Sequence, residues 1–196
     1  SFTDLKALCE KCEQVTFVHV KNQVRIQSVS SSLFGPHIYG TIDVAIPIMH
    51  GTNGEDGTIQ GYLEMLRIPY AGCDLYGAAV GQDKVLQKKI LQACGVPVAD
   101  WFYTYGYEMD EKPEKILEQA DALGYPLVLK PSRTGSSIGI HIAHNADEYI
   151  RCFHDTRQYD EKVITEKCII PLTEINCSVL GDFTDAKASL LEKVSH

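Results

Sequence analysis

A lysine followed by a glycine- and hydroxyl-rich turn is the part of this sequence best suited to chemistry. Residues 127–140 read LVLKPSRTGSSIGI, so a short apolar run is followed by Lys130 and then by Gly135, Ser136 and Ser137. Glycine lets backbone N–H groups approach an anion, the serine hydroxyls add donors, and the lysine adds a positive charge. The pattern predicts a phosphate-binding turn. It is not a Walker A motif, because no Gly-Lys-Ser/Thr leads into a helix.

Lys84 is a second candidate cation. It follows Asp83 at the predicted start of a helix, where a positive charge gains nothing from the helix dipole. An anionic ligand nearby would explain its position, and a solvated surface lysine is the alternative. The turn after Lys130 has a similar alternative, a β-hairpin whose polar residues face water.

The elements that must position these lysines alternate between strands and helices. Residues 42–49 (IDVAIPIM) form a nearly continuous apolar run, which is typical of a parallel strand buried on both faces, and they open into a loop at residues 50–57. Ligands gather at such strand ends in α/β sheets. We therefore expect this loop to belong to the site.

Hydrophobic spacing and capping residues predict the remaining elements. The helix that begins at Asp83 carries Leu86, Ile90 and Ala93 on its buried side and ends at Gly95. The others, in chain order, are a helix over 3–12, strands over 15–20 and 24–26, a helix with Ile59, Leu63 and Leu66 inward and Asp56 or Thr58 as N-cap, a strand over 101–105, a helix from Pro113, strands over 127–130 and 140–143, a helix capped by Asn145, and strands over 163–166 and 174–180.

The overall charge argues against some classes of function. The chain has 196 residues, with 18 Lys and Arg against 26 Asp and Glu, and a formal net charge of -8. This balance argues against a general binder of nucleic acid or membrane surfaces, since both need a positive field. No run approaches the roughly 18 apolar residues of a membrane span, so we expect a cytoplasmic protein.

The cysteines do not form the pattern of a disulfide framework. They number 7 and are irregularly spaced, so we expect free thiols. Cys9 and Cys12 form a lone C-x-x-C, which two faces of a helix explain better than a metal or redox site.

Four segments together resemble the D-alanine–D-alanine ligase family, a branch of the ATP-grasp superfamily. They are residues 50–61 (HGTNGEDGTIQG), 68–72 (IPYAG), 83–84 (DK) and 130–139 (KPSRTGSSIG). The H-G-x-x-G-E-D-G element is specific to this ligase group, whereas the lysines and the glycine turn alone indicate only an ATP-grasp protein. The resemblance covers residues 43–181.

The resemblance implies roles for the matching residues on the phosphate side. Lys84 and Lys130 would contact the α- and β-phosphates of ATP. Gly135, Ser136 and Ser137 belong to the loop that closes over the phosphates and reaches toward the substrate.

The resemblance also implies roles around the base and the amino acid. Glu166 and Lys167 match the hinge that receives adenine, and Glu174 matches the carboxylate that binds the ribose hydroxyls. His50 and Glu55 line the amino-acid side of the cleft and complete, with the two serines, the expected catalytic set. Surface charges at strand ends are the alternative for the first group, and a helix cap is the alternative for Glu55.

The implied reaction joins two D-alanines for peptidoglycan precursor synthesis. The carboxylate of the first attacks the γ-phosphate of ATP to give an acyl phosphate, and the amine of the second then displaces phosphate. Lysines, glycine amides and Mg²⁺ are the expected parts of such a site. The family also implies a homodimer.

The expected fold is α/β and α+β, an ATP-grasp architecture in three parts. Residues 1–76 form a partial N-terminal domain with a parallel sheet, 77–167 the central ATP-grasp subdomain, and 168–196 the start of the C-terminal subdomain. The family's N-terminal glycine-rich turn does not occur here, and neither do the C-terminal carboxylates that would bind Mg²⁺. We expect a chain truncated at both ends relative to the family, without metal ligands and without turnover on its own.

Two other functions stay open. Another ATP-grasp carboxylate–amine ligase, including the D-alanine–D-serine and D-alanine–D-lactate types, would share Lys84, Lys130 and the glycine turn. A non-catalytic nucleotide-binding module would fit the absence of the Mg²⁺ carboxylates.

Overall fold

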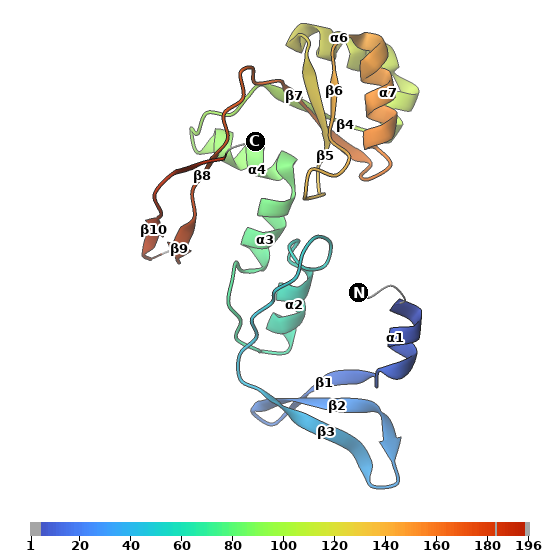
Figure 1. The fold of residues 1–196 in the computed structure, drawn as a ribbon, viewed down its shortest axis with the longest axis vertical. Coiled ribbons are helices and arrows are strands. Elements are labelled where there is room, and N and C mark those ends of the chain that lie inside the picture. Colours follow the sequence, from blue (N-terminus) through green and yellow to red (C-terminus); the bar gives the residue numbers. More distant parts are fainter. Residues whose placement is uncertain (1–4, 183, 195–196) are drawn as a thin grey trace.

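The protein is elongated in the computed structural model, which describes residues 5–182 and 184–194. A three-stranded sheet lies at one end and a four-stranded sheet covered by helices lies at the other, with helices α2 (Thr58–Met65) and α3 (Leu75–Gln82) between them (Figure 1).

The N-terminal part is antiparallel. Helix α1 (Leu5–Lys11) precedes strands β1 (Val15–Val20), β2 (Gln23–Ser32) and β3 (Gly35–Ile42), which pair in the order β1-β2-β3. The helix and β1 confirm the sequence prediction, although residues 3 and 4 of the predicted helix lie outside the described residues. Strand β2 is longer than the predicted strand over 24–26, and β3 was not predicted.

The predicted parallel strand over 42–49 is wrong. The only parallel pairing of this segment in the described part of the chain is a single bridge between Ala45 and Tyr70. Val44, Ile46 and Ile48 are 57%, 70% and 83% exposed. A strand needs its backbone groups paired along its length, and among residues 5–182 and 184–194 no neighbouring strand supplies partners. Apart from Ile42, which ends β3, the apolar run therefore lies outside the sheets.

A small core joins this part to helix α2 (Thr58–Met65). Val24, Leu63 and Ile68 are buried, with Ile59 and Leu66 packed against them, as the helical spacing predicts. The N-cap is Gly57, not Asp56 or Thr58. Gly57 has φ +91°, and a Cβ there would stand 2.8 Å from the Leu75 carbonyl, so this turn requires glycine.

Two helices meet at Asp83. Helix α3 (Leu75–Gln82) ends there and α4 (Lys84–Ala93) begins. The Asp83 carboxylate accepts from the Val85 and Leu86 N–H groups at 3.0 and 3.2 Å, which confirms the predicted start. Helix α3 spans residue 76, where the sequence predicts a domain boundary, and that boundary stays a prediction.

The predicted buried side of α4 is wrong. Leu86 and Ile90 are 43% and 45% exposed, and Ala93 is exposed as well. The side that faces the rest of the protein carries Val85, 2% exposed, and Lys88. Leu86 and Ile90 lie two residues from Lys88, about half a turn around the helix, so they point the other way.

The second sheet is antiparallel throughout and holds the main core. Strands β4 (Trp101–Tyr105), β5 (Leu127–Pro131), β6 (His141–Ala143) and β7 (Lys162–Lys167) lie in the order β4-β7-β5-β6, and we call this the central sheet. Helices α5 (Gly106–Glu111), α6 (Pro113–Leu123) and α7 (Ala146–Thr156) cover one face (Figure 1). Leu127, Leu129, Tyr149 and Phe153 are completely buried between the layers. All of these elements except α5 match the sequence prediction.

The C-terminal stretch forms small antiparallel pairs. Strand β8 (Ile175–Asn176) pairs with β11 (Glu192–Lys193), and β9 (Val179–Gly181) pairs with β10 (Ala186–Ala188). The predicted single strand over 174–180 is therefore interrupted, because the Ser178 N–H binds the Ser189 hydroxyl instead of a ladder carbonyl.

The described residues show no helix long and apolar enough to cross a membrane. All 7 cysteines are free thiols, as predicted.

The turn between β5 and β6 has no room for a side chain at Gly139. It has φ +71°, and a Cβ there would stand 2.5 Å from Cδ2 of Tyr159 and 2.9 Å from Cγ of Pro131. We expect Gly139→Ala to lower the free energy of unfolding by about 1–3 kcal/mol, measured by urea denaturation. Gly35→Ala is the matched control, because its φ is +96° with nothing within 4 Å of the added Cβ. Equal losses in the two variants would contradict a role for close packing at Gly139.

Candidate functional site

Two cavities meet on the face of the central sheet opposite α6 and α7. The larger, of about 530 Å³, lies between the sheet, α4 and the segment 168–174. Its lining combines apolar Leu91, Val128 and Leu172 with charged Glu166 and Glu174. The smaller, of about 190 Å³, is lined by Lys84 and the turn of residues 134–138, and Lys130 and Ile140 line both cavities. An apolar space therefore adjoins a cationic one.

Lys84 lies at the base of the smaller cavity. Its ammonium donates to the carbonyls of Pro131 at 3.1 Å and Thr134 at 2.5 Å, and its backbone N–H donates to the Ser132 carbonyl. Burial, followed by the nearby charge of Lys130, holds the pKa of Lys84 below its usual value. The lysine holds the turn through these carbonyls and places a positive charge at the cavity.

Glu166 binds two lysines at once. Lys88 lies 2.7 Å from its Oε1, and Lys130 pairs with its Oε2. Burial by itself raises the pKa of Glu166, but the hydrogen bonds from Lys130 and Lys88 outweigh it and hold the pKa below its usual value. The excess of positive charge in the lining of the two cavities suits an anionic ligand. That lining has four lysines against two carboxylates, namely Lys84, Lys88, Lys130 and Lys167 against Glu166 and Glu174.

The turn itself places its two serines in the left-handed region of backbone conformation. Ser136 and Ser137 have φ of 53° and 56°, so consecutive residues are left-handed. Successive N–H groups in a turn can form a concave site for an anion. That this turn binds phosphate stays a prediction.

His50 and Glu55 lie in the loop that the sequence assigned to the amino-acid side. The Glu55 Oε2 accepts from the Gly51 N–H at 2.7 Å, and His50 Nδ1 is 3.8 Å from Oε1. A Cβ on Gly135 would stand 3.9 Å from Glu55 Oε2, so this loop approaches the turn. The His50 side chain is 91% exposed. The structure brings Glu55 to the turn and leaves His50 open to solvent.

Lys167 and Glu174 are placed differently from each other. The Lys167 ammonium donates to the carbonyls of Gly124 at 2.5 Å and Tyr125 at 3.3 Å, beyond the C-terminus of α6. A cation is favourable there. Glu174 lines the larger cavity together with Lys167. The Lys167 ammonium therefore stabilises the end of α6. Any contact of Lys167 with a ligand would be made by its backbone in β7.

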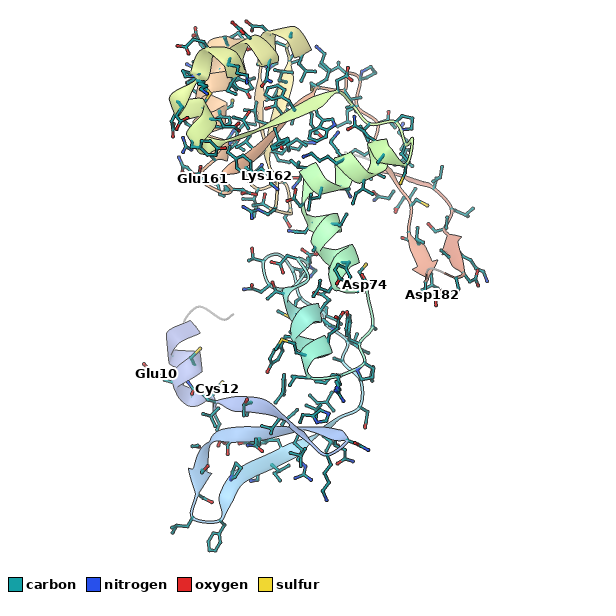
Figure 2. The ribbon with its side chains drawn as sticks, turned by 180° about the vertical axis from the view of Figure 1, so that it is seen from behind. Glu10, Cys12, Asp74, Glu161, Lys162 and Asp182 are labelled. Carbon is teal, nitrogen blue, oxygen red and sulfur yellow. The ribbon has the colours of Figure 1, made fainter. Side chains whose placement is uncertain are left out.

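A second charge cluster, whose two carboxylates are buried, supports the site. Lys162 on β7, which is labelled in Figure 2, pairs with Asp83 at the start of α4, and the Ser132 hydroxyl donates to Asp83 at 2.7 Å. The Arg133 guanidinium binds Asp160 through Nε at 3.0 Å and through a second nitrogen at 2.6 Å. These bonds tie the helix, the strand and the turn together.

Sequence reasoning missed Lys88. Its spacing of four residues from Lys84 was the available signal, because residues at i and i+4 share one face of a helix. The apolar residues of the same helix led the prediction to the opposite face.

Acid is expected to destabilise this part of the protein. Burial raises the pKa of Asp83, Asp160 and Glu166, but bonds from Lys162, Arg133 and Lys130 respectively outweigh it, so all three lie below their usual values. Lowered carboxyl pKa values stabilise the fold above about pH 5, and this contribution is lost as the pH falls below about 4. Urea denaturation at pH 7, 5, 4 and 3 measures it, and an unchanged free energy of unfolding at pH 3 would contradict the assignment.

The described residues hold no group of three or more His, Cys, Asp or Glu that could bind a metal ion.

Comparison with known proteins identifies the family. The profile described as D-ala D-ala ligase N-terminus matches residues 4–73, and the one described as D-ala D-ala ligase C-terminus matches residues 90–196. The D-alanine–D-alanine ligase of Thermoanaerobacter pseudethanolicus is 42% identical over 148 residues, which are 76% of this chain and 41% of that protein.

Solved structures agree. The D-alanine–D-alanine ligase from Coxiella burnetii has a TM-score of 0.71 at 31% identity, covering 87% of this chain and 50% of that one. The VanG D-Ala:D-Ser ligase from Enterococcus faecalis has a TM-score of 0.73 at 26% identity, covering 93% and 57%. The chain spans about half the length of the curated relatives it matches. With one profile matching more than half of its residues, this chain belongs to the D-alanine–D-alanine ligase family.

Proposed function

We propose that this chain binds ATP for a ligase that joins two D-alanines into D-alanyl-D-alanine, a step of peptidoglycan precursor synthesis. The observation that carries the proposal is the meeting of two cavities at Lys130, one apolar and ending at Glu174, the other lined by Lys84 and the turn. An apolar pocket beside a cationic one matches the two ends of a nucleotide. Family membership supports the choice of reaction.

The larger cavity is proposed to hold the adenosine. Its apolar walls at Val128, Ile142 and Leu91 suit a planar base. The β7 strand end at Glu166 and Lys167 would receive the adenine, and Glu174 would accept from the ribose hydroxyls.

The smaller cavity is proposed to hold the phosphates. Lys84 and Lys130 neutralise their charge, while the N–H groups of Gly135, Ser136 and Ser137 bind their oxygens. Phosphoryl transfer depends mainly on such positioning and charge neutralisation.

The proposed reaction has two steps. A D-alanine carboxylate oxygen attacks the γ-phosphorus of ATP, the bond to the ADP oxygen breaks, and an acyl phosphate forms. The amine of the second D-alanine attacks the acyl carbon, loses a proton and expels inorganic phosphate. The turn is proposed to exclude water, which would otherwise hydrolyse the acyl phosphate. Glu55, close to the turn, and His50 are proposed to line the amino-acid side.

Mg²⁺ is expected for this class of reaction. Because the described part of the chain has no cluster of three metal-ligating side chains, its residues do not fit a metal centre. The proposal also includes a cytoplasmic homodimer and the three-part division at residues 76 and 167.

Two measurements test the proposal. Calorimetric titration should show that ATP and ADP bind more tightly than adenosine, because only the phosphates reach the lysines. D-alanine-dependent phosphate release with ATP and Mg²⁺, with the dipeptide identified by mass spectrometry, is expected only from a protein that supplies the Mg²⁺ ligands, because the described residues of this chain form no metal-binding group. Absence of nucleotide binding would contradict the proposal.

The second substrate has alternatives. The similarity to a D-Ala:D-Ser ligase at 26% identity favours testing D-serine, and D-lactate completes the set. Nucleotide binding without turnover on any of them, in a protein that supplies the Mg²⁺ ligands, would favour a non-catalytic binding module.

A further inference from the structure

Lys88 has no role in the proposed reaction, although its ammonium lies in the larger cavity. It binds Glu166 Oε1 at 2.7 Å and the Ala99 carbonyl at 3.4 Å. Lys130 pairs with the other oxygen of the same carboxylate. Glu166, with a side chain only 10% exposed, therefore has a cation on each oxygen.

The two lysines are held differently. Lys88 has a second acceptor at Ala99, and its side chain is 13% exposed. Lys130 is 27% exposed and lines the smaller cavity as well, beside Lys84 and the turn. Lys130 is therefore the partner that can reach a phosphate, and Lys88 is the partner fixed on Glu166.

We propose that Lys88 is a positioning residue that keeps Glu166 paired when Lys130 turns from this carboxylate to the phosphates of the nucleotide. The inference rests on the proposed function, since it requires ATP in the two cavities. A buried carboxylate left without a counter-ion is strongly unfavourable. With Lys88 in place, Lys130 exchanges its ion pair with Glu166 for one with the phosphates. Glu166 keeps Lys88 as its counter-ion throughout.

The test compares ATP and adenosine binding in four proteins. Lys88→Met removes the charge and keeps the chain length, Lys88→Arg restores a cation, and Lys89→Met is the matched control. Lys89 is the next residue on the same helix, but its ammonium lies over the Tyr103 ring, 4.5 Å from the centroid. The wild type is titrated first, and failure to bind ATP there would contradict the proposed function before any variant is compared.

The expected result is specific to phosphate. Lys88→Met weakens ATP binding about tenfold and leaves adenosine binding unchanged, because adenosine does not draw Lys130 away from Glu166. Lys88→Arg binds ATP within about threefold of the wild type, and Lys89→Met matches the wild type.

A double-variant cycle separates positioning from direct contact. In a Glu166→Gln background no carboxylate is left to strand, so Lys88→Met should have little further effect on ATP affinity. Unchanged ATP affinity in Lys88→Met would overturn the proposal. So would an equal loss for ATP and adenosine, which indicates a merely structural role, or the same tenfold loss in the Glu166→Gln background, which indicates direct phosphate contact. If Lys88→Met does not fold by circular dichroism, Lys88→Gln replaces it in the cycle.

Discussion

Replacing Lys130 with alanine is expected to weaken ATP binding by about 10- to 100-fold. Hydrogen bonds to charged groups contribute about 1.5–3 kcal/mol each, and 1.4 kcal/mol corresponds to a factor of ten. Lys130 is the one lysine that lines both cavities in the described part of the chain. Its removal does not strand Glu166, which keeps Lys88 at 2.7 Å, so the loss should fall on binding more than on folding.

Calorimetry with ATP and adenosine checks this prediction. Adenosine affinity should change little, since the adenosine pocket keeps its apolar walls. Lys115→Ala is the control, because Lys115 is an exposed lysine on α6, outside both cavities. ATP affinity equal to that of the wild type in Lys130→Ala would contradict the assignment of the smaller cavity to phosphates.

Replacing Asp83 with alanine is expected to lower the free energy of unfolding by about 3–5 kcal/mol. Removal of one partner from a buried ion pair leaves the other charge uncompensated, and this is the cost usually measured. Here the stranded charge is Lys162, whose side chain is 12% exposed. The variant also loses the N-cap of α4 and the acceptor for the Ser132 hydroxyl.

Two variants set the scale for Asp83→Ala in urea denaturation. Asp83→Asn keeps a good capping side chain without the charge, so its loss should be smaller. Asp74→Ala removes an exposed cap that accepts only the Gly77 N–H, at 2.6 Å, and should cost about 1 kcal/mol. Losses of the same size for Asp74→Ala and Asp83→Ala would show that the ion pair with Lys162 adds nothing.

Local signals in the sequence predicted the parts of the site that depend on neighbouring residues. The turn after Lys130 and the cap at Asp83 each depend on residues that are adjacent in the sequence. A short segment was therefore enough to predict them. The helices over the central sheet follow in the same way from spacing and caps. The resemblance to a known family added the expectation that these separate segments form one site.

Features that depend on distant partners could not be predicted in this way. Residues 42–49 have the composition of a buried strand, but composition does not supply the neighbouring strand that pairing requires. The apolar residues of α4 indicated one buried side, whereas Glu166 on β7 attracts Lys88 to the opposite side. The pairing of Asp83 with Lys162 likewise joins segments that are far apart in the chain.

The strand order of the central sheet has a consequence for synthesis on the ribosome. Strand β7 lies between β4 and β5, yet it is the last of these strands in the sequence. Until Lys167 has left the exit tunnel, β4 and β5 have no strand between them, and the core under α6 and α7 lacks Val163. Such long-range pairing folds slowly and exposes apolar surface meanwhile. The nascent chain therefore carries two unpaired strand edges through most of the translation of this region.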